Sequence, residues 1–391
     1  MNLEYTWRWF GPKDPITLDT IKQTGVTGIV SSLHHKKPGE VWSIEEIKKH
    51  NQIIEDNGLK WSVVESIPVH EDIKKQSGRW KEWIENYKET IENLASCNVK
   101  TICYNFMPIL DWTRTDLDFP LGDGTTGLRF DQKAFIAFEL YLLERKEAEK
   151  NYSSQQKKEA HTYFKNLDNK QKQQLVNNII AGLPGGHDEY SLADFKAILK
   201  EYQSIDESKL RTHLAHFMKE IVPVAEKYEV KLCIHPDDPP YPILGLPRIV
   251  STEKDAKWLL NTVDSFYNGL TFCTGSYGVR TDNDLPGMIK RMGDRIHFLH
   301  LRSVQREDGV SFYEADHLQG SSQVTEVMHT LLSTFQSSDR TIPVRPDHGH
   351  KMMDDLDKIS NPGYSCIGRL DGLAKLKGLE KGIQYSLNVI N

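Results

Sequence analysis

The amino-acid sequence predicts a (β/α)8 (TIM) barrel, an α/β fold in which eight parallel strands alternate with helices. Three observations predict it. First, eight short stretches of strand character recur along the 391 residues, each followed by a helical stretch. Second, several of these stretches end in ionisable side chains, as the strands of a parallel barrel do at their catalytic end. Third, no GxGxxG pattern follows a predicted strand, which argues against the alternative, a doubly wound open sheet with a dinucleotide site.

The first half of the chain predicts four strands and three helices. Ser43 with Glu46 three residues later is a capping-box pattern that begins a helix, and the Asn57-Gly58 pair ends that helix. Between residues 79 and 96, large apolar side chains recur at three- and four-residue intervals, which indicates one buried helix face. We therefore expect strands over residues 3–8, 25–33, 60–69 and 99–110, and helices over residues 15–24, 43–57 and 79–96.

Residues 111–205 interrupt this alternation, and we interpret them as a mainly helical insertion between the fourth and fifth strands of a single barrel domain covering residues 1–391. Residues 112–130 are turn-rich and polar, whereas residues 131–150 are expected to be helical. Residues 155–181 are rich in Lys and Gln with few large apolar side chains, so they should pack over the barrel instead of forming a core of their own. We expect the insertion to serve as a lid or an oligomer contact.

The alternation resumes after the insertion. A helix with apolar side chains from Leu210 to Val224 leads into the fifth strand. The remaining strands are expected near residues 232, 270, 297 and 343, followed by helices over residues 252–263, 282–292, 321–335 and 370–386. Together with the first half, this gives the eight strands that a (β/α)8 barrel requires.

Composition excludes several classes of function. Hydrophobic residues make up 38% of the chain, enough for a substantial core, while a net charge of −6 and a pI near 6.2 provide no field that would attract nucleic acid. No stretch is apolar over the length that spans a bilayer, and the first residues lack a secretory pattern. Five cysteines without a close CxxC pair suit a reducing compartment. We expect a soluble cytoplasmic protein whose cysteines are mostly buried thiols.

Four successive predicted strands each end in a residue that can bind a metal. These residues are His235, Cys273, His300 and Asp347. Taken singly, each is more often structural, because a strand histidine or a lone cysteine is commonly part of a core. In a barrel, however, the carboxyl ends of neighbouring strands share one rim, so the four would converge. Two imidazoles, a thiolate and a carboxylate suit zinc in four-coordination, or a divalent ion with two open positions if the geometry is octahedral.

Other polar residues near strand ends are candidates for substrate contacts. Arg8, Glu65, Asn105, Arg302 and Arg345 could hold an anionic, hydroxylated ligand, because Arg offers a bidentate fork to carboxylates. The alternative is that they form salt bridges across the rim. Asp237 and Asp238, between prolines, could support the metal ligands or be polar turn residues, and we favour the turn.

Two further residues are candidates for proton transfer. His348 follows Asp347 and is either an acid or base or a residue that supports the metal ligands. Tyr364 lies in a Pro/Gly-rich loop after the eighth strand, where it is either a surface plug or an active-site group. His187, like several other loop histidines, has no assigned role.

Motifs spread over the whole chain resemble those of the mannonate dehydratase family. They are WRWFGP (7–12), VVESIPVHEDIK (63–74), CYNFMPILDWTRTDL (103–117), HPDDPPYPILGLPRIVS (235–251), CTGSYGVR (273–280), HLRS (300–303), RPDHGH (345–350) and NPGYS (361–365). The resemblance implies a barrel related to xylose isomerases and one Mn²⁺ or Fe²⁺ per chain. It places the metal ligands at His235, Cys273, His300 and Asp347 and the acid and base at His348 and Tyr364.

The implied reaction converts D-mannonate to 2-dehydro-3-deoxy-D-gluconate and water, a step in glucuronate breakdown. It removes the C2 proton and expels the C3 hydroxyl. We expect Tyr364 to take the proton and His348 to protonate the hydroxyl, with the reverse assignment left open. Partners are thus a sugar acid and further copies of the chain in a homo-oligomer, with no nucleic acid or membrane.

Three alternatives remain at this point. The first is a metal-dependent sugar or sugar-acid isomerase on the same barrel. The second is a phosphodiester-cleaving barrel enzyme, which the net charge and the ligand count for a single metal disfavour. The third is a protein without activity whose metal braces the barrel, which predicts a closed four-coordinate shell.

Overall fold

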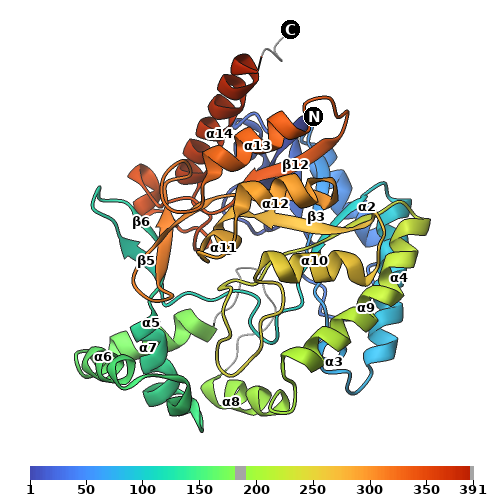
Figure 1. Cartoon of the computed structure of the whole chain (residues 1–391). Coiled ribbons are helices and arrows are strands. Elements are labelled where there is room, and N and C mark those ends of the chain that lie inside the picture. Colours follow the sequence, from blue (N-terminus) through green and yellow to red (C-terminus); the bar gives the residue numbers. More distant parts are fainter. Residues whose placement is uncertain (181–190, 388–391) are drawn as a thin grey trace.

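The computed structural model describes residues 1–180 and 191–387, and it confirms the predicted barrel (Figure 1). Eight parallel strands close in the order β1-β12-β9-β8-β7-β4-β3-β2. They are β1 (Asn2–Arg8), β2 (Gly28–Ser31), β3 (Lys60–Glu65), β4 (Thr101–Tyr104), β7 (Lys231–Ile234), β8 (Asn268–Cys273), β9 (Ile296–Leu301) and β12 (Thr341–Pro346). His187 and the end of the helical stretch predicted to reach residue 181 lie outside the described residues.

Helices surround the barrel at the positions that the apolar periodicity predicted (Figure 1). The Ser43 side chain accepts from the backbone N–H of Glu46 and the Glu46 carboxylate accepts in return, so the capping box forms. Gly58 has a φ of +72°, the left-handed conformation expected after a helix end. The helices are α1 (Leu18–Lys22), α2 (Ile44–Glu55), α3 (Glu71–Lys75), α4 (Trp80–Ser96), α9 (Glu207–Lys227), α10 (Glu253–Thr262), α11 (Thr274–Gly278), α12 (Leu285–Met292), η3 (Gly293–Arg295), α13 (Val324–Thr334), η4 (Met353–Asp357) and α14 (Cys366–Ser386).

The segment between β4 and β7 is mainly helical, as expected, but its first part is not a loop. Residues expected to be turn-rich form the hairpin β5 (Asp116–Pro120) and β6 (Thr126–Phe130). The helix expected over residues 131–150 is broken into shorter turns. The helical elements are α5 (Gln132–Ala137), η1 (Phe138–Leu142), η2 (Ala148–Asn151), α6 (Ser154–Lys165), α7 (Asn169–Ile180) and α8 (Leu192–Glu201).

A second sheet, which the sequence did not predict, connects this segment to the loop after β9. The hairpin β10 (Ser303–Arg306) and β11 (Phe312–Ala315) pairs with the β5–β6 hairpin in the antiparallel order β10-β11-β6-β5. We call these four strands the accessory sheet. Phe130 of β6 stacks on Phe312 of β11, with ring centroids 5.8 Å apart. The pairing joins residues far apart in the sequence, so no local sequence pattern predicts it.

Apolar side chains and two cysteines fill the barrel interior. They form a cluster of Val30, Val63, Cys103, Cys233 and Phe298. Cys103 and Cys233 are thus buried thiols, as the cysteine count predicted. This cluster closes the barrel, so a ligand can enter only at a rim.

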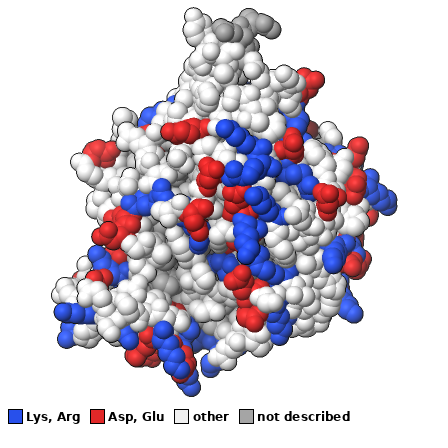
Figure 2. Space-filling view, in the orientation of Figure 1, with Lys and Arg blue, Asp and Glu red and all other residues white. Residues whose placement is uncertain are grey.

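Charged side chains of both signs share the surface drawn in Figure 2. On the face drawn in Figure 2, basic and acidic side chains lie intermixed, as expected for a slightly acidic chain. Within the described ranges, no helix combines the length and the apolar character needed to cross a membrane.

Candidate active site

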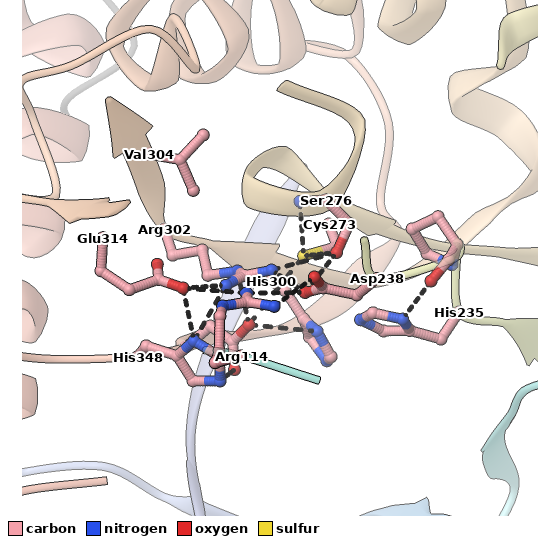
Figure 3. A network of polar contacts seen from close by, with 12 residues as sticks. Arg114, His235, Asp238, Cys273, Ser276, His300, Arg302, Val304, Glu314 and His348 are labelled. Atoms are coloured by element: carbon pink, nitrogen blue, oxygen red, sulfur yellow. Dashed lines mark hydrogen bonds and ion pairs between the residues drawn. The ribbon is translucent and has the colours of Figure 1, made fainter. Parts of the chain in front are cut away.

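Three of the predicted metal ligands converge at the carboxyl ends of neighbouring barrel strands. His235 follows β7, Cys273 ends β8 and His300 lies in β9. One ligand atom from each lies within 4.8 Å of those of the other two, and the two imidazole centroids are 5.0 Å apart (Figure 3). The strand ends therefore bring together two nitrogen donors and one sulfur donor.

Asp347, which follows β12, adds a carboxylate to the same cluster. Its Oδ2 lies 3.9 Å from Cys273 Sγ and 3.9 Å from His300 Nδ1. Its Oδ1 accepts from Arg345, and Arg302 Nε lies 3.1 Å from Oδ2. The four residues predicted from strand spacing thus lie together, and two guanidinium groups orient the carboxylate.

The charges of this cluster suit a divalent cation. Burial alone would raise the pKa of Cys273, but Arg302 and the two histidines hold it well below its ordinary value, so the group is a thiolate. Burial alone would lower the pKa of His235, but the adjacent thiolate raises it to about 10. Both ring nitrogens of His300 are buried without a close hydrogen-bond partner among the described residues. A metal ion would satisfy one of these nitrogens and replace the proton on His235, while His300 Nε2 lies 3.5 Å from Glu65 Oε1.

A pocket lies next to the cluster and is lined by one of its members, His235. Its lining includes six of the residues that the sequence predicted for the site: His235, Asp347, His348, Tyr364, Asn105 and Arg345. Cys273 and His300 do not line this pocket, and neither do Arg8 and Arg302.

His348 and Tyr364 meet at this pocket. Their rings are perpendicular with centroids 5.2 Å apart, and Tyr364 is only 3% exposed, so it is not a surface plug. Gly349 pairs with Tyr364 in an isolated bridge that holds the loop against the end of β12. Burial, and then the Asp347 carboxylate, raise the pKa of Tyr364 above its ordinary value, so its phenol keeps its proton at neutral pH.

Arg8 and Arg302, the two predicted arginines that do not line the pocket, pair with carboxylates. Arg8 donates to the backbone carbonyl of Glu65 and lies 3.7 Å from its carboxylate. Arg345 Nη2 lies 3.0 Å from Glu65 Oε1. The guanidinium of Arg302 is occupied by Asp238 and Glu314 in addition to Asp347. Arg8 and Arg302 therefore make the salt bridges that were the alternative to substrate contact.

An ion network next to the cluster contains residues that the sequence did not single out as functional (Figure 3). Arg114, from the start of the inserted segment, lies 2.7 Å from Asp238 Oδ1 and 3.1 Å from Glu314 Oε1. Glu314, from β11, also lies 3.0 Å from His348 Nδ1. The interpretation of Asp238 as a turn residue was wrong, because its carboxylate is buried between two arginines. Asp237 instead accepts from Ser251 Oγ and from the backbone N–H of Val250, both at 2.7 Å, so it ties its loop to residues 250–251.

This network makes the fold sensitive to acid. Arginines hold the pKa of four carboxylates below ordinary values, although burial alone would raise it: Glu65, Asp238, Glu314 and Asp347. A pKa that is lower in the folded state gives stability that is present above the unfolded pKa and lost as pH falls. We expect the melting temperature of the chelator-treated protein to fall as pH drops from about 4.5 towards about 2, the interval that the values for Glu314 delimit. A melting temperature that stays constant over that interval would contradict these ion pairs.

Comparisons with known proteins agree with the geometry. The model of the family described as D-mannonate dehydratase (UxuA) matches residues 3–389. The chain belongs to this family.

Similar proteins of the mannonate dehydratase family cover nearly the whole chain. A mannonate dehydratase of Marinomonas sp. is 54% identical over 98% of this chain and 100% of its own length. One from Chromohalobacter salexigens is 52% identical over 98% of this chain and 99% of its own length. The crystal structure of mannonate dehydratase from Streptococcus suis serotype2 superimposes with a TM-score of 0.80 at 33% identity, covering 100% of this chain and 96% of that one. The family resemblance seen in the motifs is thus confirmed.

Proposed function

We propose that this chain dehydrates D-mannonate to 2-dehydro-3-deoxy-D-gluconate in hexuronate catabolism. The observation that carries the proposal is the cluster of His235, Cys273 and His300, with the Asp347 carboxylate beside it, next to a pocket lined by His348 and Tyr364, in a member of the mannonate dehydratase family. Elimination of water from a sugar acid needs these parts: a cation for the developing charge, a base for the C2 proton and an acid for the C3 hydroxyl.

His235, Cys273, His300 and Asp347 would hold one Mn²⁺ or Fe²⁺. When bound, such an ion acts as a Lewis acid that stabilises the enediolate-like charge next to the substrate carboxylate, which is worth several kcal/mol. The mixed nitrogen, sulfur and oxygen donors accept either metal. His235 and Asp347 reach the pocket, so the substrate can approach the cluster from that side.

His348 and Tyr364 would transfer the protons. Burial keeps the Tyr364 phenol protonated, the form in which it can donate a proton to the leaving C3 hydroxyl. His348, on the same pocket, is then the base for the C2 proton. This reverses the order that we expected from the sequence, because burial near Asp347 disfavours the phenolate that a tyrosine base requires.

Arg345 and Asn105 are the predicted polar contacts that line the pocket, and we propose that they hold the carboxylate and hydroxyl groups of the substrate. Arg8 and Arg302 would act indirectly, by holding Glu65 and Asp347. A homo-oligomeric state and a cytoplasmic location stay predictions from the sequence.

A product analysis tests the proposed function. Purified protein is incubated anaerobically with D-mannonate after chelation and add-back of Mn²⁺ or Fe²⁺. We expect metal-dependent formation of a 2-keto-3-deoxy acid, lighter than the substrate by one water. A product of the same mass as D-mannonate would support the isomerase instead. If neither product forms, the proposed function is wrong.

A further inference from the structure

The structure points to a role for the accessory sheet in proton transfer. We propose that Glu314 is a positioning residue that accepts the Nδ1–H of His348 and thereby turns Nε2 of the ring towards the pocket. The inference rests on the proposed function, because that function makes His348 the base. It adds a residue that lies outside the barrel strands and the metal ligands.

The contact is direct and buried. Glu314 Oε1 lies 3.0 Å from His348 Nδ1, and Glu314 is 3% exposed. Although burial alone would raise its pKa, Arg302, His348 and Arg114 hold the pKa of Glu314 at about 2, so the carboxylate is ionised and can only accept hydrogen bonds. A neutral imidazole that donates from Nδ1 keeps its lone pair on Nε2.

The other ring nitrogen of His348 lies on the side of Asp347. His348 lines the pocket, and its Nε2 lies 3.9 Å from Asp347 Oδ1, beyond hydrogen-bond distance. Arg302 Nη1 lies 2.8 Å from His348 Nδ1, and it also donates to Glu314. If Arg302 donated to the ring instead, Nδ1 would carry the lone pair and Nε2 the proton. The two arrangements give opposite tautomers, which an experiment can distinguish.

The accessory sheet holds Glu314 in place. Arg114 from the inserted segment pairs with Glu314 and lies over the ring of Phe312, 4.7 Å from its centroid. Trp112 lies under the same guanidinium at 4.9 Å and meets His348 edge-on, with centroids 6.0 Å apart. The inserted segment and the β10–β11 hairpin thus enclose the carboxylate and the imidazole from outside the barrel. Positioning Glu314 against His348 would thus require both the inserted segment, which supplies Arg114, and the β10–β11 hairpin, which supplies Glu314.

Glu314→Gln tests the proposal with a variant of the same size. The Gln amide can donate to Nδ1, which favours the wrong tautomer. We expect kcat for D-mannonate to fall about 10- to 100-fold, a part of the roughly 10²- to 10⁴-fold that acid–base catalysis contributes, with KM and Mn²⁺ affinity nearly unchanged. Glu307→Gln is the matched control. Glu307, the residue after β10, pairs with Arg129 of β6 at 2.8 Å, and within the described part of the chain it makes no hydrogen bond or ion pair with His348, so this variant should keep the wild-type kcat.

A ring spectrum tests the geometry without activity. Imidazole ¹⁵N resonances of the histidine-labelled full-length protein are recorded, and those of His348 are identified by their absence in His348→Gln. We expect a protonated Nδ1 in the wild-type protein and its loss in Glu314→Gln. A wild-type proton on Nε2, or an unchanged kcat in a folded Glu314→Gln, would overturn the proposal. If D-mannonate is not a substrate, the proposed function fails while the spectrum still decides the role of Glu314. If the variant does not fold, the wild-type spectrum decides alone.

Discussion

Replacing Cys273 by Ser is expected to weaken Mn²⁺ binding by more than about 100-fold, beyond the 10- to 100-fold loss typical of residues that only support a ligand, and to abolish turnover of D-mannonate. The reason is the charge of the sulfur. Arg302 and the neighbouring histidines keep Cys273 as a thiolate, whereas a serine hydroxyl stays neutral and is a much weaker ligand. The measurement is the metal content after dialysis, together with a Mn²⁺ titration followed by electron paramagnetic resonance.

Cys233→Ser is the matched control for this variant. Cys233 is also a buried thiol at a barrel strand, but it belongs to the interior cluster and its sulfur lies 3.3 Å from the carbonyl of Ile102. A buried hydroxyl costs about 1–3 kcal/mol of stability at most there, and it leaves the donor set intact. Wild-type metal content in Cys273→Ser would remove the ligand assignment, and loss of metal in Cys233→Ser would show that the effect is not specific.

The barrel and the donor cluster could be predicted because both follow from local patterns. Each barrel strand is a short apolar run next to an amphipathic helix, and the parallel arrangement places the carboxyl ends of all strands on one rim. His235, Cys273, His300 and Asp347 follow or end such runs, so the topology alone brings them together. The same reasoning could not give the direction of every side chain. It left substrate contact and salt bridges across the rim both open for Arg8 and Arg302, which the structure shows paired with buried carboxylates.

The accessory sheet and its ion network could not be predicted in this way. Strands β5, β6, β10 and β11 have only four or five residues each, too few for a periodic pattern to stand out from a loop. Their pairing is fixed by contacts between distant segments. Arg114 and Glu314 are separated by 200 residues, so nothing in the sequence near either one indicates a partner. For Asp238 the sequence allowed either a turn or a contact that supports the metal ligands, and its burial between Arg114 and Arg302 favours the second.

His348→Gln and Tyr364→Phe are each expected to lower kcat by about 10²- to 10⁴-fold, the usual contribution of a general acid or base. Neither side chain is among the proposed metal ligands, so Mn²⁺ content should stay at the wild-type level. If one substitution lowered both kcat and Mn²⁺ content, it would indicate that the substitution damages the fold and not only proton transfer. Melting temperatures measured on the same samples separate these outcomes.

The two variants should differ in one partial reaction. If His348 removes the C2 proton and Tyr364 protonates the leaving hydroxyl, Tyr364→Phe still exchanges the C2 hydrogen of D-mannonate with solvent in deuterium oxide, because its base is intact. His348→Gln should lose both exchange and elimination. Exchange that survives in His348→Gln and disappears in Tyr364→Phe would restore the opposite order. Near-normal turnover by Tyr364→Phe would show that Tyr364 is neither the acid nor the base. The raised pKa of its phenol would then have no catalytic role.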